Sequence, residues 1–335
     1  MSLRRVGPGI VLTTAAMVAI AVGGPVVLDQ FDLLQLTIVA SMCILALSLG
    51  VVWGYAGVLC FGQSAFFGLG AYAYAVTTVN LGESTVAMVL SIAVPAAFAV
   101  LLGYFMFYGR LSDVYLSVIT LSVTLIFFNL MNSTAGDAYR IGKAHLNGFN
   151  GMPSLPTFNV PGDPGRLLNP TETFYLVMAL LLAVYLGLHA LLTSHFGRVV
   201  VAVRENETRC ELLGYDIRLY KLLVFTIGGG VAGLAGSLFA NWGAFVSPTV
   251  FSLSMASHII IWVIIGGLGT LVGPIIGCVV MQYLATALGT QQLANTNLIF
   301  GLIFIAFVLL VPRGIVPSVA ALGARTFGPR PRDLA

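Results

Sequence analysis

Long apolar runs alternate with short polar segments along most of this 335-residue chain. Runs of about 18 or more apolar residues are typical of helices that span a membrane. The pattern predicts ten such helices, at residues 9–28, 33–53, 64–80, 85–107, 114–131, 172–193, 222–246, 256–271, 272–290 and 296–312. The Gly-rich segments 54–63 and 266–277 could instead be broken or re-entrant helices, so eight to ten spans are expected.

The composition supports a membrane protein and no other class. The chain is 59% hydrophobic and only 8% charged, whereas soluble domains are about one quarter charged. Lipid offers no hydrogen-bond partners, so spanning segments form helices or closed barrels, and barrel strands would alternate polar and apolar residues. We therefore expect an all-α polytopic integral membrane protein with a single transmembrane domain over residues 1–335, in which the run 9–28 is a retained span and not a cleaved signal peptide.

The basic residues predict the orientation, because loops on the cytoplasmic side hold the excess of lysine and arginine. With the N-terminus inside, twelve of the fifteen basic residues are cytoplasmic, including those of loop 194–221 and tail 313–335. Both termini are then cytoplasmic. The outer loop 132–171 is interpreted either as a linker or as a surface that receives an external partner or covers a substrate entrance.

Nine charged residues fall between Ser194 and Lys221, five basic and four acidic. A lipid-binding patch would be strongly positive, and this one is nearly neutral. Glu205 and Arg209 are four residues apart with the acidic residue first, which is the favourable order for an ion pair on a helix. Gly214 is well placed to end that helix. The stretch therefore predicts a mixed-charge helix that docks into a protein cleft; the alternative is a solvated connecting helix.

Glycines recur at four-residue spacing, as Gly50/Gly54, Gly229/Gly233 and Gly269/Gly273/Gly277. Small residues on one face allow helices in lipid to pack closely. Segments 54–73 and 264–277 also carry polar residues or proline, and interrupted helices of this kind indicate the binding region of a transporter. The candidate substrate-pathway residues are Gly62, Gln63, Ser64, Phe67, Gly266, Gly267, Gly269 and Thr270.

The interiors of the predicted spans contain no Asp, Glu, Lys or Arg, although ion-coupled carriers usually hold ionisable residues there. Residues 136–144 imitate a phosphate-binding loop, but the glycine spacing is too long and Ala144 replaces Ser or Thr. No nucleophile, base or metal-ligand cluster is evident either. A transporter of this kind, which is not itself an enzyme, is expected to take its energy from a partner.

Three motifs resemble the permeases of high-affinity branched-chain amino acid ABC transporters of the LivM type. Residues 194–207 fit the family pattern S-x-x-G-R-x-x-x-A-[IV]-R-[ED]-[ND]-E, followed by Glu211, Gly214 and Lys221. The segment GYAGVLCFGQSAFFGLGAY is similar to the family's early motif, and residues 247–277 are similar to its late motif SP-x-x-F…GG-x-GT-x-x-GP-x-x-G. The likeness extends from about residue 35 to 316.

The resemblance implies a pore-forming subunit in a bacterial inner membrane, paired with a second homologous permease. Two cytoplasmic ATPase subunits would bind ATP and Mg and drive the pair, and a periplasmic binding protein would deliver substrate. This chain would hold no cofactor, metal or nucleic acid. Segment 204–214 would be the coupling helix, and the candidate coupling residues are Arg198, Arg204, Glu205, Asn206, Glu207, Arg209, Glu211, Gly214 and Lys221.

Departures from the family pattern leave the substrate open. Gln63 stands where His is usual, and His258 and Trp262 stand where aliphatic residues are usual. The superfamily also includes urea and short-chain amide permeases, and the Gln63 amide suits such ligands. A branched-chain or other small amino acid is expected, with urea or an amide as the alternative. A self-contained ion-coupled carrier or channel is a further alternative.

Overall fold

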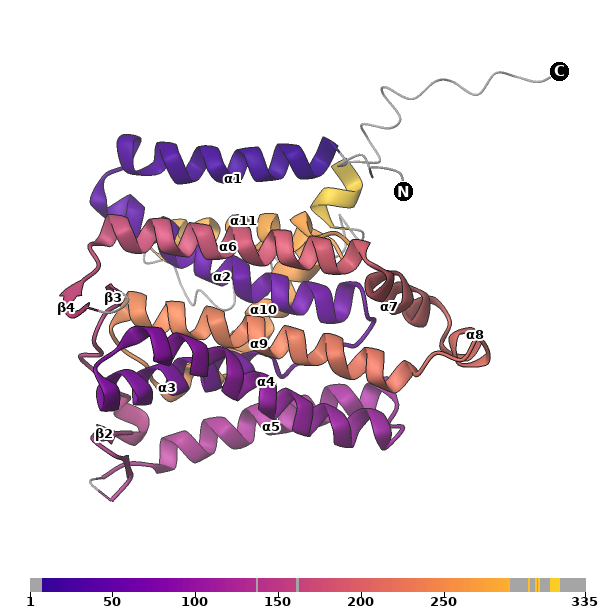
Figure 1. Cartoon of the computed structure of the whole chain (residues 1–335), viewed down its shortest axis with the longest axis horizontal. Coiled ribbons are helices and arrows are strands. Elements are labelled where there is room, and N and C mark those ends of the chain that lie inside the picture. The colour runs from indigo at the N-terminus through magenta and orange to yellow at the C-terminus, as the bar shows by residue number, and fades with distance from the viewer. Residues whose placement is uncertain are drawn as a thin grey trace.

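Long helices run roughly side by side through the whole molecule (Figure 1). The computed structural model describes residues 8–136, 138–160, 163–289 and 314–319, together with positions 301, 305 and 307. Six helices in this part of the chain are long and apolar enough to cross a membrane. They are α1 (Pro8–Val27), α2 (Gln30–Gly54), α4 (Ser84–Tyr108), α5 (Asp113–Ser133), α6 (Pro170–Thr193) and α9 (Ile217–Gly243).

Three further helices correspond to the remaining expected spans that the structure describes. They are α3 (Gln63–Leu81), α10 (Leu253–Gly266) and α11 (Val272–Gly289). Nine of the ten predicted spans are thereby found as helices, and the predicted span 296–312 lies outside the described residues apart from three single positions. Tail 313–335 is described only at 314–319. The expected all-α polytopic class is confirmed.

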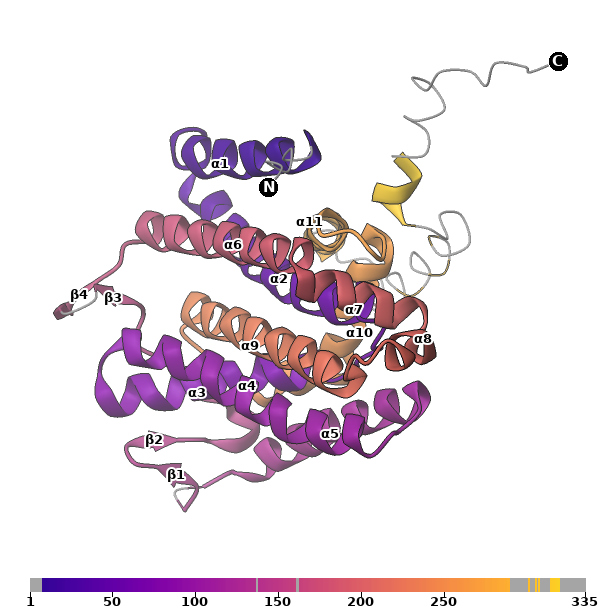
Figure 2. The same cartoon turned by 45° about the vertical axis from the view of Figure 1, so that its right-hand side comes forward.

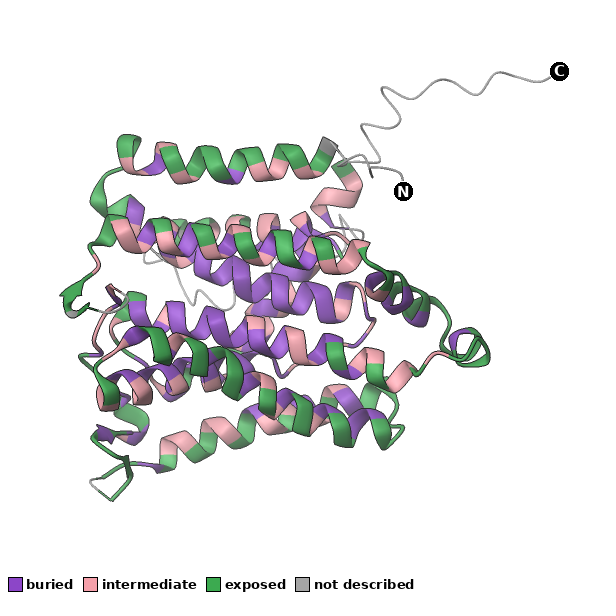
Figure 3. Cartoon of the chain, in the orientation of Figure 1, coloured by how far each residue is buried: buried purple, intermediate pink, exposed green. Residues whose placement is uncertain are grey.

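Helix α9 lies at the centre of the bundle. It packs against α2, α3 and α4, and Figure 2 shows it between α2 and α6 on one side and α3, α4 and α5 on the other. Burial is greatest on α2, α3 and α9, whereas very few residues of α1 are buried (Figure 3). Exposed aliphatic and aromatic side chains on the outer helices would be unfavourable in water and are solvated in lipid.

Glycines allow the backbones around α9 to come close together. A methyl group at Gly70 of α3 would overlap the backbone of Gly233, and one at Gly236 would overlap the carbonyl of Phe67. Gly50 of α2 faces the ring of Pro274 in α11 in the same manner. The predicted close packing of the glycine faces is thus confirmed, as expected where helices in lipid associate through van der Waals contact.

The two ends of the bundle differ in character. The end here called the β end holds the segment between α5 and α6, with its two short antiparallel pairs. These are β1 (Arg140–Ile141) with β2 (Ala144–His145), and β3 (Asn159–Val160) with β4 (Asp163–Leu167); the 3₁₀ turn η1 (Gly148–Asn150) lies between the pairs.

This outer segment is tied to the bundle and is not a loose linker. Met152 and Val246 exchange two backbone hydrogen bonds, at 2.7 and 3.2 Å. The Asn159 side chain accepts a hydrogen bond from the backbone N–H of Ser84 at 2.7 Å. The segment is therefore not a floppy linker, and its role as a surface for an external partner or a cover of a substrate entrance stays a prediction. Because these bonds fix the segment against α4 and the end of α9, it forms a defined surface.

The opposite end, here called the charged end, holds α7 (His195–Glu205), α8 (Glu207–Leu212) and the turn between α4 and α5. The first residues of α1 and residues 315–319 lie at the same end (Figure 1). Arg110 and the basic residues of 194–221 are at the charged end, whereas Arg140, Lys143 and Arg166 are at the β end. The fold thus separates the basic residues as the predicted alternation of spans requires.

Candidate functional site

The charged loop forms two short helices and not one continuous helix. Asn206 is extended, at φ −160°, and its side chain accepts the backbone N–H of Arg209 at 2.9 Å, so it caps α8. Side chains of this type compete with helical hydrogen bonds, which explains the break. The predicted helical pairing of Glu205 with Arg209 is therefore wrong. Gly214 follows α8 with φ +86°, as predicted for its role in ending the helix.

Helices α7 and α8 are held together by a small apolar cluster. Val199 and Val203 of α7 and Cys210 of α8 are buried against one another and against the side chain of Tyr220 in α9. Most of the predicted coupling residues project outward from this cluster. The exposed ones are Arg198, Arg204, Glu205, Asn206, Glu207, Arg209, Glu211 and Gly214, and Lys221 is half-buried.

The tip of α8 carries two exposed leucines. Leu212 is 83% exposed and Leu213 is 75% exposed, although both are large apolar side chains. They stand immediately before Gly214, at the end of α8, which is the outermost helix of the charged end (Figure 1). Sequence reasoning missed them because it followed the charges. Two adjacent leucines in an otherwise charged loop were the available signal.

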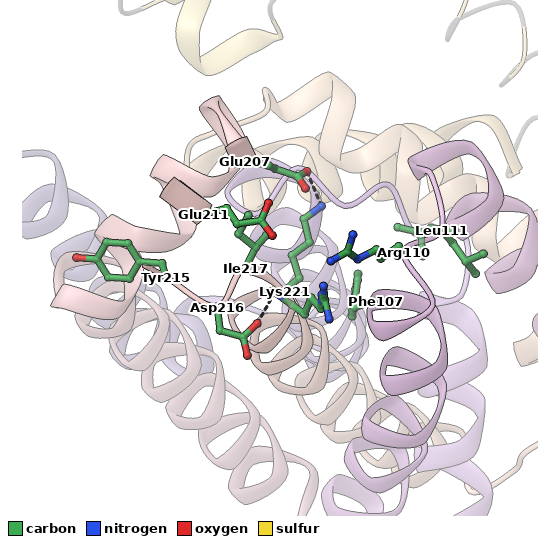
Figure 4. A pocket seen from close by; sticks show the side chains of 11 residues that line it. Phe107, Arg110, Leu111, Glu207, Glu211, Tyr215, Asp216, Ile217 and Lys221 are labelled. Atoms are coloured by element: carbon green, nitrogen blue, oxygen red, sulfur yellow. Dashed lines mark hydrogen bonds and ion pairs between the residues drawn. The ribbon is translucent and has the colours of Figure 1, made fainter. Parts of the chain in front are cut away.

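A cavity of about 480 Å³ lies beside α8, between the α4–α5 turn and the start of α9. Figure 4 shows Glu207 and Glu211 from α8 and Arg110 from the turn around this space. Lys221 Nζ and Glu207 Oε1 form an ion pair at 2.6 Å. Three acidic and three basic side chains line the cavity: Glu207, Glu211, Asp216, Arg110, Arg218 and Lys221.

Two of these charged side chains support the surrounding structure. Asp216 caps α9 by accepting the backbone N–H groups of Arg218 and Leu219, at 3.1 and 3.3 Å. The Arg218 guanidinium lies 5.8 Å from the centre of the Tyr108 ring, which joins α9 to the end of α4. The cavity therefore has fixed walls of mixed charge, which suits contact with a complementary protein surface.

Arg204 joins α7 to two Gly-rich segments. Its Nη1 donates a hydrogen bond to the carbonyl of Gly54, at the end of α2. Its side chain passes Gly57, where an added Cβ would lie 3.1 Å from Arg204 Cγ. At Gly269, in the turn between α10 and α11, an added Cβ would lie 3.6 Å from Nη1. The Arg204 side chain thus joins α7 to two segments that are far apart in the sequence, the end of α2 and the α10–α11 turn.

The segment between α2 and α3, residues 55–62, is irregular. Its polar backbone is supported by hydroxyl groups along α5, because lipid supplies no partners. Ser117 Oγ donates to the carbonyl of Leu59 at 3.1 Å, and the N–H of Phe61 donates to Thr120 Oγ1 at 3.2 Å. Thr124 Oγ1 lies 3.4 Å from the carbonyl of Phe61. The predicted spans 33–53 and 64–80 are therefore two separate helices, α2 and α3, joined by this irregular segment.

We expect Thr120→Val to destabilise the protein by about 1–3 kcal/mol, because the valine side chain has nearly the same shape but leaves the buried N–H of Phe61 without an acceptor. Thermal unfolding in detergent measures this. Ser122→Ala is the control, since Ser122 bonds only within its own helix, to the carbonyl of Val118. Equal melting temperatures for the two variants would contradict the supporting role of Thr120.

The predicted substrate-pathway residues of α3 are buried at its first turn. Gln63 is 1% exposed and Ser64 is 0% exposed. Within the described part of the chain, neither end of the Gln63 amide nor the Ser64 hydroxyl has a hydrogen-bond partner. The Gln63 amide lies beside Gly228 of α9. Buried polar groups without a partner are unfavourable by about 1–3 kcal/mol each, which makes these side chains candidates for contact with a bound molecule.

The second Gly-rich segment is a tight hairpin turn. Gly267 and Gly269 have φ of +110° and +80°, which only glycine adopts without strain. Thr270 Oγ1 donates to the carbonyl of Gly267 at 3.2 Å and accepts the N–H of Gly273 at 3.1 Å. The predicted hairpin between two spans is found here. This turn meets the end of α2 where Gly269 approaches Gly54.

Comparison with known proteins decides the family. The model of the branched-chain amino acid transport system permease component matches residues 33–310. The chain belongs to this family. The permease is thus a component of a transport system, and six of its described helices are long and apolar enough to cross a membrane.

Two relatives match over nearly the whole of this chain, and a third matches over less than half of it. The permease is 30% identical to the high-affinity branched-chain amino acid transport permease LivM of Salmonella typhimurium, over 90% of this chain and 74% of the relative. It is 28% identical to LivM of Escherichia coli, over 91% of this chain and 75% of the relative. An autoinducer 2 import permease, LsrC of an Enterobacter, is 31% identical over 40% of this chain and 41% of its own. No solved structure gives a significant match.

Proposed function

We propose that this permease is the transmembrane subunit of an ABC importer that moves a branched-chain amino acid across a bacterial inner membrane. The family membership supports this reading, together with one structural observation. The α7–α8 pair projects from the bundle with an apolar tip, Leu212 and Leu213, next to a cavity of mixed charge. Buried apolar anchors surrounded by complementary charges are characteristic of protein interfaces.

The charged end would face the cytoplasm and the β end the periplasm. Two ATPase subunits, which bind ATP and Mg, would dock at the charged end. A periplasmic binding protein would dock at the β end, where the α5–α6 segment is fixed. A second, homologous permease would complete the pathway within the bilayer, and no nucleic acid is involved. The distribution of basic residues between the two ends supports this orientation.

ATPase movement would reach the membrane through α7. The Val199–Val203–Cys210 cluster makes α7 and α8 move together. Arg204, at the end of α7, then transmits that movement to Gly54 and Gly269. Both lie beside the segments that contain the predicted pathway residues, which are Gly62, Gln63, Ser64, Phe67, Gly266, Gly267, Gly269 and Thr270. Since Gln63 and Ser64 are buried without partners in this state, a shift of α3 would open them to substrate.

A urea or short-chain amide importer of the same family is the second candidate. The observation that favours it is the buried Gln63 amide, whose donor and acceptor would match those of an amide ligand. The complete importer with its binding protein, reconstituted in liposomes, separates the candidates. We expect ATP-dependent uptake of labelled leucine. Uptake of urea or acetamide without leucine would establish the second candidate instead.

We expect Leu213→Asp to weaken association with the ATPase subunits at least about tenfold, because a buried interface anchor contributes roughly 2 kcal/mol or more. Co-purification of the ATPase subunits measures this. The control is Leu167→Asp, an equally bulky leucine that is 54% exposed at the β end. Full assembly and uptake with Leu213→Asp would disprove docking at the α8 tip.

A further inference from the structure

A second cavity, of about 280 Å³, lies among α2, α3, α9, α10 and α11. It is in the half of the bundle nearer the β end, because its lining comes from the early part of α2 and the last turns of α9. Its size is close to the lower limit of ordinary ligand pockets and suits a small molecule. None of its lining residues was predicted as part of the pathway except Phe67.

The cavity borders both Gly-rich segments. Phe67 is one turn along α3 from Gln63 and Ser64, and Trp262 is one turn before Gly266 in α10. The Phe67 ring lies 5.4 Å from that of Phe239, and the His258 ring stacks on Trp262 with centres 6.4 Å apart. A ligand in this space would rest on the two aromatic side chains that adjoin the predicted moving parts.

The lining divides into an apolar part and a polar part without net charge. Met42, Phe67 and Trp262 provide apolar surface, and Ser252, Ser254 and Gln282 provide hydroxyl and amide groups. None of the lining residues is Asp, Glu, Lys or Arg. Such a site suits a molecule that is neutral overall, with one aliphatic and one strongly polar end.

A neighbouring cavity of about 290 Å³ lies closer to the β end. It shares Gln282 with the first, and Asp32 and Gln35 of α2 also line it. Asp32 is in the first turn of α2, at the β end, and is an acidic group that an ammonium ion would approach. The two cavities therefore adjoin at Gln282, with the second one nearer the start of α2.

We propose that these two adjoining cavities form the outer binding chamber of the permease, where the transported amino acid is held before it reaches the Gly-rich segments. This inference rests on the proposed import function and specifies where its substrate binds. The aliphatic side chain would contact Met42, Phe67 and Trp262, and the ammonium and carboxylate groups would face the hydroxyl and amide side. Urea has no apolar part, so some of its N–H groups would face the apolar wall without a hydrogen-bond partner. These unpartnered groups would make urea bind more weakly than an amino acid.

Cysteine labelling tests the chamber directly in the complete importer. The four native cysteines, Cys43, Cys60, Cys210 and Cys278, are all buried. A cysteine at exposed Ser254 therefore reports on the chamber. We expect saturating leucine to slow the alkylation of Ser254→Cys by N-ethylmaleimide at least fivefold, and urea and acetamide to leave the rate unchanged. Ser257→Cys, one turn along α10 and outside the lining, should show no protection.

A filling substitution gives a second, independent test. Ser254→Phe should lower ATP-driven leucine uptake at least tenfold while the ATPase subunits remain bound, and Ser257→Phe should retain uptake within twofold. If the wild-type importer takes up leucine but neither substitution nor labelling distinguishes the two positions, the chamber is wrong. Protection of Ser254→Cys by urea or acetamide and not by leucine would overturn the substrate class. If the wild-type importer fails to take up leucine at all, the proposed function itself fails.

Discussion

Arg204→Ala is expected to lower ATP-driven uptake by about tenfold to a hundredfold while the ATPase subunits stay bound and continue to hydrolyse ATP. A hydrogen bond to a charged group contributes about 1.5–3 kcal/mol, and each 1.4 kcal/mol corresponds to tenfold. The variant removes the guanidinium that connects α7 with Gly54 and Gly269. The docking surface on α8 is left unchanged, so the variant should still bind the ATPase subunits although its uptake is lowered.

The measurements are uptake, ATPase rate and co-purification in the same reconstituted complex. Arg209→Ala is the matched comparison, because Arg209 is an exposed arginine on α8, where any effect should fall on binding of the ATPase subunits and not on coupling. Arg204→Lys should recover part of the uptake, because an ammonium group can still donate a hydrogen bond to the Gly54 carbonyl. Lysine lacks the planar guanidinium group that also approaches Gly269, so the recovery should be incomplete. If Arg204→Ala lost ATPase binding, or transported normally, Arg204 would not be the connection between docking and the bundle.

Gly70→Ala is expected to destabilise the folded permease by about 3 kcal/mol or more, at the upper end of the range for overpacked cores. The added methyl group would overlap the backbone of Gly233 in α9. Backbone cannot rotate away as a flexible side chain does, so α3 and α9 would have to separate. The yield of folded protein from membranes and its melting temperature in detergent measure the effect.

Gly187→Ala is the opposite case and serves as its control. Gly187 lies in α6 with no atom within 4 Å of an added Cβ. Because alanine favours a helix over glycine by about 1 kcal/mol, this variant should be unchanged or slightly stabilised. Equal losses in the two variants would mean that the close approach of α3 and α9 does not decide stability.

The sequence determined the membrane class, nearly all the spans and the division of the charges between the two ends. These features depend on local composition: apolar runs of sufficient length must form helices in lipid, and charged residues must lie outside it. The role of Gly214 also followed from the sequence, because ending a helix with positive φ is a local property. The glycine spacing predicted close packing in the same way.

Only the tertiary structure decided which of these pieces meet. The continuous helix through Glu205 and Arg209 was wrong because a single side-chain cap at Asn206 outweighs a weak charge pair. Arg204 is one of nine charges in the loop, and its contact with Gly54, 150 residues away, depends on how the ends of α2, α7 and the α10–α11 turn come together. The chamber beside Phe67 and Trp262 likewise exists only once five helices have packed. Spacing along the chain fixes periodic and local features, whereas contacts between distant segments arise from packing, which the order of residues alone does not reveal.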